Sequence, residues 1–292
     1  MDLRETLASG RVLLLDGAMG TELAKVKPGL QGNLSANLTH PVQVASIHAK
    51  YLRAGSQGIT TNTFQLSALT PEQERQQVDL DRMNKTGVAL ARNVARDDYY
   101  VLGGLGPTGR LFGLDACMTD DAVRAAYLAQ ARSLTASGAV DGLIIETMTS
   151  LREALLALDA CREVTDKPVI VSMSYYTMNR DIRTMNGETA AECAQKLTEM
   201  GADSVGTNCS KFLMHEMAQV VAAMRAAVEK VPIIAQPNAG QPHGVQSTYD
   251  MSPEQFADGV EQCIKAGATV VGGCCGAGPE WMREVKKRVE KM

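Results

Sequence analysis

The sequence predicts a single (β/α)8 TIM barrel, and three features of the chain lead to this fold class. Eight short runs of β-branched and aliphatic residues alternate with eight amphipathic stretches of helical length along the 292 residues. The short runs lack polar alternation, which is typical of parallel strands covered on both faces. No Pro-, Gly- or Ser-rich linker separates the units, so we expect one domain spanning residues 1–292. Eight strand-then-helix units favour a closed barrel over an open doubly wound sheet.

The predicted strands are the eight apolar runs, and a helical stretch follows each of them. This alternation is the pattern of a parallel sheet built from βα units. In chain order the strands are expected at residues 12–16, 58–62, 100–105, 142–146, 168–174, 204–208, 232–236 and 269–273.

The predicted helices have amphipathic spacing and recognisable ends. Ser252, followed by the apolar Phe256 and Val260, resembles a capped helix start with a core-facing stripe. A glycine stands at the position of a C-terminal cap after several of the helices, namely at Gly55, Gly138, Gly201 and Gly267. The helices are expected at residues 40–54, 70–96, 119–137, 150–164, 187–199, 213–230, 252–266 and 279–290.

Composition excludes several classes of protein. The 29 Lys and Arg against 33 Asp and Glu give a formal charge of −4 with no basic block, so nucleic acid is not an expected partner. No apolar run approaches the roughly 18 residues that span a bilayer, and no secretory signal is present, so we expect no membrane partner. Seven cysteines without a signal indicate reduced thiols and a cytoplasmic location.

Three of these cysteines, Cys209, Cys274 and Cys275, stand where two predicted strands end in Gly-Thr-Asn-Cys-Ser and Gly-Gly-Cys-Cys-Gly. A structural zinc finger would show two close Cys/His pairs, a pattern that the sequence lacks. Three sulfurs would leave the fourth position of tetrahedral Zn²⁺ open to a substrate, as in a catalytic site. Adjacent cysteines of a regular strand point to opposite faces, so the neighbouring glycines must allow a bend if both reach one ion.

The alternative interpretation is that the cysteines are small buried hydrophobes. We expect this for Cys161, Cys193 and Cys263, which fall within predicted helices. From spacing alone, both interpretations of the other three remain open. The barrel favours the metal site, because the C-terminal ends of its sixth and eighth strands lie close together around the ring.

The same end of the barrel gathers the other candidate residues. In (β/α)8 barrels the active site lies at the C-terminal ends of the strands, where the βα loops begin. Polar residues and glycine follow the predicted strands there, and the candidates for substrate binding are Asp16, Gly17, Thr61, Glu146 and Asn238.

Seven short motifs follow one another along nearly the whole chain. They are Leu-Asp-Gly-Ala-Met-Gly-Thr-Glu (15–22), Thr-Asn-Thr-Phe (61–64), Gly-Leu-Gly-Pro-Thr-Gly-Arg (104–110), Ile-Glu-Thr (145–147), Gly-Thr-Asn-Cys (206–209), Pro-Asn-Ala-Gly (237–240) and Gly-Gly-Cys-Cys-Gly (272–276). Their order resembles the homocysteine-binding domain of the homocysteine S-methyltransferase family. The second and third motifs look most like cobalamin-dependent methionine synthase, and less like the betaine-using or S-methylmethionine-using branches.

The resemblance implies that residues 1–292 form a homocysteine-binding barrel. It implies a Zn²⁺ site whose ligands, and catalytic residues, are Cys209, Cys274 and Cys275. It also implies a homocysteine pocket lined by Asp16, Gly17 and Glu146, with Asn238 at or near the open zinc position.

The expected reaction is transfer of a methyl group to the thiol of homocysteine, giving methionine. An ordinary thiol titrates near 8.5, and coordination to a cation removes its proton and positions the sulfur. The chain leaves no length for the folate, corrinoid and activation domains of a full synthase. We therefore expect the methyl group to come from methylcobalamin, from cobalamin on a separate corrinoid protein, or from a small donor.

Three alternatives remain open. The donor could be S-methylmethionine or betaine. The barrel could be a non-catalytic zinc-binding subunit that docks a corrinoid protein. A metal-free thiol enzyme would need one hyper-reactive cysteine, and no histidine is placed beside the three cysteines to activate it.

Overall fold

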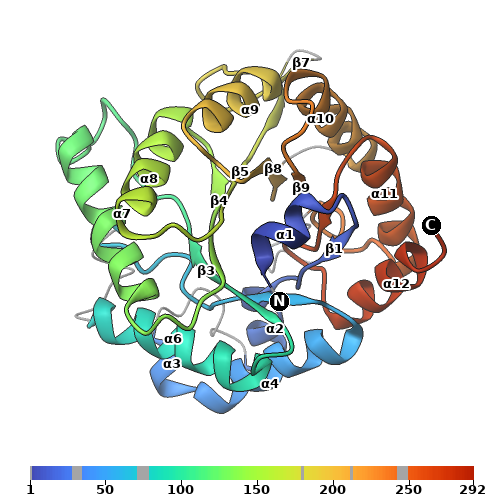
Figure 1. Ribbon diagram of the computed structural model, residues 1–292, viewed down its shortest axis with the longest axis horizontal. Helices are drawn as coiled ribbons and strands as arrows, with labels where there is room; N and C mark the ends of the chain where they lie inside the picture. The colour runs from blue at the N-terminus through green and yellow to red at the C-terminus, as the bar shows by residue number, and fades with distance from the viewer. Residues whose placement is uncertain (1, 28–34, 71–78, 179–180, 211–212, 242–248) are drawn as a thin grey trace.

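The computed structural model describes residues 2–27, 35–70, 79–178, 181–210, 213–241 and 249–292. Eight parallel strands form a nearly closed barrel, and helices surround it (Figure 1). The predicted (β/α)8 fold class is confirmed. The barrel strands are β1 (Leu13–Leu14), β2 (Gly58–Thr60), β3 (Tyr100–Leu105), β4 (Gly142–Met148), β5 (Val169–Met173), β8 (Ser204–Asn208), β9 (Ile233–Gln236) and β10 (Val270–Val271).

The strands follow one another around the barrel, in the order β1-β10-β9-β8-β5-β4-β3-β2. The seam between β1 and β2 is joined partly by side chains. Gln57 accepts a hydrogen bond from the Leu14 amide at its Oε1, at 3.0 Å, and donates from its own amide to the Leu14 carbonyl, at 2.7 Å. Closer to the C-terminal ends of these strands, the Thr60 amide donates to Oδ2 of Asp16, at 2.9 Å. A carboxylate therefore replaces a backbone acceptor at the mouth of the barrel.

All eight predicted helices occur among the described residues, although the N-terminal part of the one expected at 70–96 lies partly outside them. Thr119, Ser150, Thr189 and Ser252 each cap the helix that follows through a side-chain oxygen. The helices are α4 (Pro41–Ala54), α6 (Leu80–Ala95), α7 (Asp120–Thr135), α8 (Leu151–Val164), α9 (Ala190–Glu199), α10 (Met214–Ala227), α11 (Pro253–Lys265) and α12 (Pro279–Val289).

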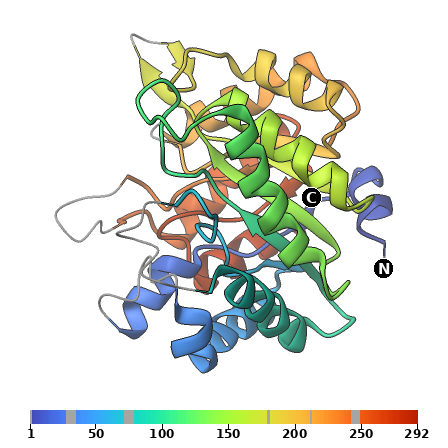
Figure 2. The same cartoon turned by 90° about the vertical axis from the view of Figure 1, so that its left-hand side faces the viewer.

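Five further elements were not expected from the sequence. A short helix precedes the barrel, two helices lie in the connection after β1, and a two-stranded antiparallel hairpin follows β5. They are α1 (Leu3–Ala8), α2 (Met19–Val26), α3 (Ala36–Thr39), β6 (Tyr176–Met178) and β7 (Asp181–Arg183). In the side view the hairpin and α1 lie at opposite ends of the molecule (Figure 2).

The helix α1 closes the N-terminal end of the barrel. Its Leu3 and Leu7 belong to the cluster of buried apolar side chains inside the strands, and the view along the barrel places α1 within the ring (Figure 1). Burial of apolar surface contributes about 25 cal/mol of stabilisation for each Å², so the packing of α1 into the barrel stabilises the fold. The rest of the barrel interior at this end is also apolar, with Leu13, Leu15, Tyr100, Leu102, Ile144, Ile170, Ile234 and Val270.

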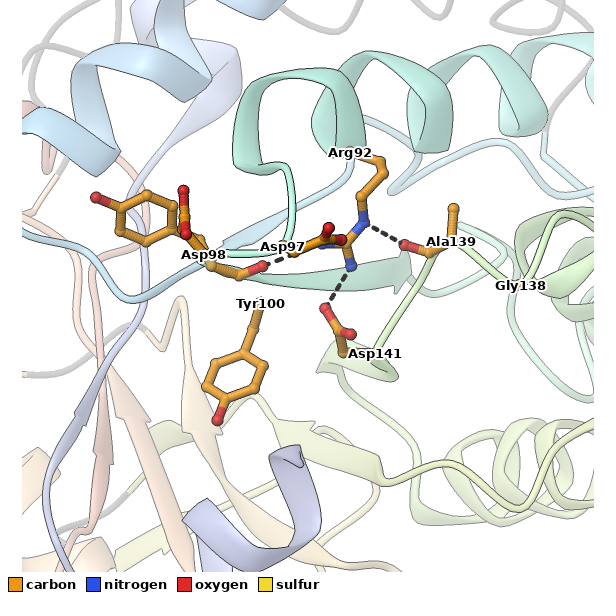
Figure 3. Close-up of a pocket in the computed structure, with 8 residues that line it drawn as sticks. Arg92, Asp97, Asp98, Tyr100, Gly138, Ala139 and Asp141 are labelled. Atoms are coloured by element: carbon orange, nitrogen blue, oxygen red, sulfur yellow. Dashed lines mark hydrogen bonds and ion pairs between the residues drawn. The ribbon is translucent and has the colours of Figure 1, made fainter. Parts of the chain in front are cut away.

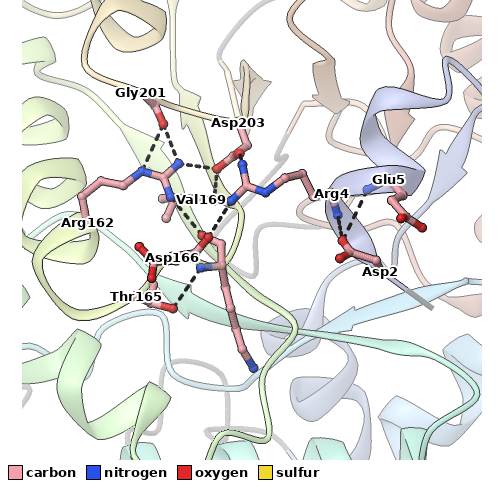
Figure 4. A network of polar contacts seen from close by, with 10 residues as sticks. Asp2, Arg4, Glu5, Arg162, Thr165, Asp166, Val169, Gly201 and Asp203 are labelled. Carbon is pink, nitrogen blue, oxygen red and sulfur yellow. Dashed lines mark hydrogen bonds and ion pairs between the residues drawn. The ribbon is translucent and has the colours of Figure 1, made fainter.

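Charged side chains at the same end are paired. Asp203, which precedes β8, accepts hydrogen bonds from Arg4 of α1 and Arg162 of α8, and its Oδ2 also accepts from the Val169 amide at 2.8 Å (Figure 4). A cavity of about 300 Å³ lies nearby, beside Arg92, whose guanidinium donates to Asp141 at 2.5 Å and to the Ala139 carbonyl at 2.8 Å (Figure 3). These contacts hold the N-terminal ends of the strands together and leave the opposite end for a site.

Within the described part of the chain, no helix is long and apolar enough to cross a membrane.

Candidate functional site

The three candidate cysteines meet at the C-terminal mouth of the barrel. The sulfurs of Cys209, Cys274 and Cys275 all lie within 4.8 Å of one another, and those of Cys209 and Cys275 are 3.6 Å apart. A tetrahedral zinc ion with Zn–S bonds of about 2.3 Å places its sulfur ligands about 3.8 Å apart. The spacing of these thiols therefore fits a single ion of this kind.

Backbone bends after β8 and β10 make this convergence possible. Cys209 has a φ of 50°, in the left-handed region that non-glycine residues rarely adopt. Gly276 has a φ of 81° and turns the chain immediately after the paired cysteines. The Cys274 amide donates to the Pro237 carbonyl at 2.8 Å, and the Cys275 carbonyl accepts from the Ala239 amide at 2.9 Å. Backbone hydrogen bonds to the loop after β9 thus fix the second half of the cluster.

Asn208 connects the cluster to the neighbouring strands. Its Nδ2 lies 3.8 Å from the Cys274 sulfur and donates to Oγ1 of Thr147 at 2.7 Å. Its Oδ1 accepts from the Thr147 amide at 2.7 Å and from the Ser172 hydroxyl at 2.8 Å. Thr147 has a φ of 62°, which is unusual for a β-branched residue. Such strained conformations cost about 1 to 3 kcal/mol each and cluster at functional sites.

The three thiols share their protons. Hydrogen bonds from Cys209 and Cys274 hold the pKa of Cys275 below its usual value. Hydrogen bonding to the other two sulfurs, together with burial, raises the pKa of Cys274. One sulfur is thus favoured as a thiolate and its neighbours as donors, as expected when three like groups crowd one place without a counter-charge. A cation at the centre would favour the thiolate form of all three.

Asp16 and Glu146 form a pair of carboxyl groups with raised pKa values at the same mouth. Burial raises the pKa of Asp16 to about 7, although the Thr60 amide favours its charged form. Burial also raises the pKa of Glu146 to about 8, with further contributions from Asp16 and Cys275. Among the described residues, no hydrogen-bond donor meets the Glu146 carboxylate. A cationic group that entered the mouth would stabilise the ionised forms of both carboxyl groups.

Gly17 and Thr61 have clear packing roles. A Cβ atom at Gly17 would lie 2.2 Å from the Ala277 carbonyl oxygen, so a side chain is sterically excluded there. The Thr61 hydroxyl accepts from the Gly104 amide at 2.9 Å and lies 2.6 Å from the Thr63 hydroxyl. Contact of either residue with a substrate stays a prediction.

Asn238 lies beside the cluster with an unsatisfied acceptor. Its Nδ2 donates to the Ser210 carbonyl at 3.4 Å, whereas its Oδ1 is buried and has no hydrogen-bond partner among the residues that the structure describes. Such atoms are rare in folded proteins and indicate a missing ion, water or ligand. A mostly apolar cavity of about 260 Å³ adjoins this point and is lined by Ser210, Leu213, Met214, Met217, Pro237, Asn238, Gly240, Gln241, Asp250 and Met251.

Two tyrosines at the site were not identified from the sequence. The Tyr51 hydroxyl lies 2.9 Å from the Ala18 carbonyl and 3.1 Å from the Ala277 carbonyl, and so ties the loops after β1 and β10 together. Tyr249 packs over Gly276, where an added Cβ would lie 2.4 Å from its ring, and its hydroxyl helps to lower the pKa of Cys275. Both contacts join distant segments, so no local sequence pattern could reveal them.

Three of the remaining four cysteines are buried, as predicted. Cys161, Cys193 and Cys263 are buried within α8, α9 and α11, and each is a free thiol. Cys117 is free and exposed. The cluster is therefore the group of cysteines, among the described residues, whose arrangement suits a metal ion.

The fold and the site together define a (β/α)8 barrel with a three-thiol cluster and two carboxyl groups of raised pKa at its C-terminal mouth. The chain belongs to the homocysteine S-methyltransferase family, whose model matches residues 13–289.

Individual relatives agree with this assignment. A methionine synthase of Mycobacterium leprae is 30% identical over 311 residues, which cover 99% of this chain and 25% of that protein. The chain thus spans about a quarter of the length of this relative. The metallated form of the homocysteine methyltransferase MmuM from Escherichia coli is 22% identical, with a TM-score of 0.80 and coverage of 99% of this chain and 100% of that one. The apo form of MmuM has a TM-score of 0.76 with the same coverage.

Proposed function

We propose that this protein transfers a methyl group to the thiol of homocysteine, giving methionine, and that it depends on zinc. The observation that carries the proposal is the meeting of Cys209, Cys274 and Cys275 at the barrel mouth. Membership of the homocysteine S-methyltransferase family supports the acceptor. The metal, its ligands and the methyl donor are parts of the proposal.

The residues present fit a zinc ion with one position to spare. Three thiolates are soft ligands of the kind zinc prefers, and three protein ligands plus one open position is the pattern of a catalytic zinc site. The buried, unpartnered Oδ1 of Asn238 supplies an oxygen next to the cluster. We infer that this amide stands at or near the open position before a substrate enters.

The carboxyl groups of Asp16 and Glu146 are the proposed partners of the substrate ammonium group. Asp16 is buried and Glu146 is partly buried at the mouth, and neither meets a cationic side chain among the described residues. An amino acid with a thiol in its side chain can present its sulfur to the cysteines and its ammonium group to these carboxyl groups. Thr61 and Gly17, at the ends of β2 and β1, would border the same space.

The chemistry then follows from positioning. Zinc, when bound, would lower the pKa of the homocysteine thiol and hold its sulfur as a nucleophile. Asp16 and Glu146 would fix the other end of the substrate, so that the sulfur points out of the mouth toward an incoming methyl group. Asn208, bonded to strands β4 and β5, would keep Cys274 in place. Orientation of this kind supplies a large share of the rate enhancement in bimolecular transfers.

For the donor, we propose a corrinoid-bound methyl group, either on methylcobalamin or on a separate corrinoid protein. The proposal is supported by the motifs Thr-Asn-Thr-Phe and Gly-Pro-Thr-Gly-Arg and by the 30% identity to a methionine synthase. A panel assay tests it, with zinc-loaded protein and homocysteine offered methylcobalamin, a methylated corrinoid protein, S-methylmethionine or betaine. Methionine formed from a sulfonium or betaine donor alone would overturn the corrinoid assignment.

The zinc site is tested by Cys274→Ala, with Cys263→Ala as the matched control. Both replace a free thiol, but Cys263 is buried in α11 and outside the cluster. Zinc content and methionine formation should fall together in Cys274→Ala and stay near the parent level in Cys263→Ala. Methionine formation at the parent rate by zinc-free Cys274→Ala would reject the mechanism. Tight zinc binding without turnover from any donor would instead indicate a non-catalytic subunit.

A further inference from the structure

The side chains inside the barrel change from apolar to polar near its C-terminal mouth. Ile144, Ile170 and Ile234 belong to the apolar cluster inside the strands. Residues two positions apart on a strand share one face, so the next inward-facing positions are polar. These positions hold Glu146, Ser172 and Gln236, and the corresponding residue of β8 is Asn208.

Within this polar layer, Gln236 has an unsatisfied group. Ser172 and Asn208 are hydrogen-bonded to each other at 2.8 Å. Oε1 of Gln236 is buried without a hydrogen-bond partner in the described part of the chain, and the whole residue is only 4% exposed. Buried acceptors are nearly always hydrogen-bonded in folded proteins, so the unpaired Oε1 suggests a donor that is not part of the chain.

The side chain of Gln236 lies near the backbone of Asp16, at the end of β1. Gln236 pairs with Asn208 in the parallel register of β9 and β8. On its other side lies Gly272, where an added Cβ would be 3.1 Å from Nε2 of Gln236 and 2.7 Å from the backbone oxygen of Asp16. The side chain of Gln236 thus extends over the space that Gly272 leaves empty, at the end of β1 where Asp16 lies.

We propose that Gln236 is a substrate-binding residue that recognises the α-amino group of the thiol substrate. This inference rests on the proposed function. An ammonium group has three N–H donors, and the carboxyl groups of Asp16 and Glu146 account for two acceptors. The buried Oε1 of Gln236 is the third. An amide is suited to this place, because it accepts a hydrogen bond without adding a third negative charge beside the two carboxyl groups.

The test compares two ligands on the zinc-loaded protein. Homocysteine has the amino group, and 4-mercaptobutanoate is the same molecule without it. The variant Gln236→Met keeps the size of the side chain and removes its acceptor. Calorimetry should show homocysteine binding weakened tenfold or more in Gln236→Met, whereas binding of 4-mercaptobutanoate changes less than twofold. Gln195→Met, on the exposed face of α9, is the matched control and should bind both ligands as the parent does.

Other outcomes would overturn the inference. Equal weakening of both ligands would indicate a general packing role, and unchanged homocysteine binding would remove Gln236 from the site. Zinc content and thermal unfolding of each variant show whether the metal site and the fold are intact. If Gln236→Met does not fold, Gln236→Glu, which keeps an acceptor, must retain the parent's preference for homocysteine over 4-mercaptobutanoate. If the parent protein makes methionine but Gln236→Met shows no selective loss of homocysteine binding, this inference alone is contradicted. A parent that does not bind homocysteine contradicts the proposed function as well.

Discussion

The side-chain nitrogen of Asn208 lies 3.8 Å from the sulfur of Cys274, and the same amide spans three strands of the barrel. Its oxygen accepts from Thr147 on β4 and Ser172 on β5, while its own backbone ends β8. One buried carboxamide therefore links the cysteine cluster to the two strands that precede it around the ring. Such supporting partners commonly matter to a metal site nearly as much as the ligands do.

Replacing Asn208 with Leu should weaken both the fold and the metal site. The change leaves the Thr147 amide without an acceptor in a buried place, and an orphaned buried group costs about 1 to 3 kcal/mol. We expect a loss of that size in the free energy of unfolding, measured by urea denaturation, and a zinc affinity at least tenfold weaker in a chelator competition. Asn93→Leu, on an exposed position of α6, should change the free energy of unfolding by less than about 0.5 kcal/mol. Parent-like zinc affinity in Asn208→Leu would contradict the supporting role.

Replacing Gly17 with Ala should disturb the loop that carries the paired cysteines. The new Cβ would lie 2.2 Å from the Ala277 carbonyl, and the Ala277 amide donates to the Cys274 carbonyl at 3.0 Å. Overpacking of this kind costs about 1 to 3 kcal/mol. Urea denaturation should show that loss, and the zinc content of the purified protein should fall with it. Gly138→Ala tests the specificity of the effect, because Gly138 has a φ of 70° but open space around it. It should lose some stability through backbone strain and keep its zinc.

Much of the fold follows from local sequence patterns. The strands expected at 100–105 and 204–208 coincide with β3 and β8, because continuous apolar runs between helices define buried parallel strands. Helix α1 was not predicted, because two leucines within six residues are too few to show a helical periodicity. The hairpin of β6 and β7 was not predicted either, because its short strands are mixed in polarity and show no apolar periodicity.

The site was predictable only in part. The cysteine cluster could be anticipated, because strand ends of a closed barrel must meet at one mouth. The number of hydrogen bonds that Asn208 makes, the contact of Tyr249 with Cys275, and the unpaired oxygen of Gln236 depend on side-chain packing across strands. None of these leaves a spacing pattern in the sequence. Gly17 illustrates the same limit, since the sequence places it at the mouth and the structure adds the carbonyl oxygen that excludes a side chain.

The affinity for methionine should rise with pH between 6 and 8. Methionine carries the ammonium group of the substrate but has no thiol proton to lose, so its binding reports on the carboxyl groups. Burial raises the pKa of Asp16 to about 7 and that of Glu146 to about 8, so both gain charge across this range. A group with a pKa of 7 becomes about tenfold more ionised between pH 6 and pH 8, and we expect at least that gain in affinity.

The measurement is calorimetric titration of metal-free protein with methionine at several pH values. In Asp16→Asn and Glu146→Gln, the dependence on pH should become shallower, because each variant removes one titrating partner of the ammonium group. An affinity that is constant or falls with rising pH in the parent protein would contradict the assignment of these carboxyl groups.

His48 should make the protein sensitive to acid. It is fully buried in α4, and neither ring nitrogen has a hydrogen-bond partner within the described ranges of the chain. Burial lowers its pKa from 6.5 to about 4, so the folded protein binds fewer protons than the unfolded chain between these values. Stability contributed by the neutral ring is therefore complete above pH 6.5 and is lost as the pH falls toward 4. At about 1.4 kcal/mol per pH unit, the loss amounts to about 2 to 3 kcal/mol.

His48→Leu should remove this loss, since leucine fills the buried position without titrating. Urea denaturation at pH 7 and pH 4.5 should show that the variant retains about 2 kcal/mol more of its free energy of unfolding on acidification than the parent does. His215→Leu is the matched control, because His215 is exposed on α10. It should follow the parent at both pH values, and an equal fall in the parent and in His48→Leu would show that acid sensitivity arises elsewhere in the protein.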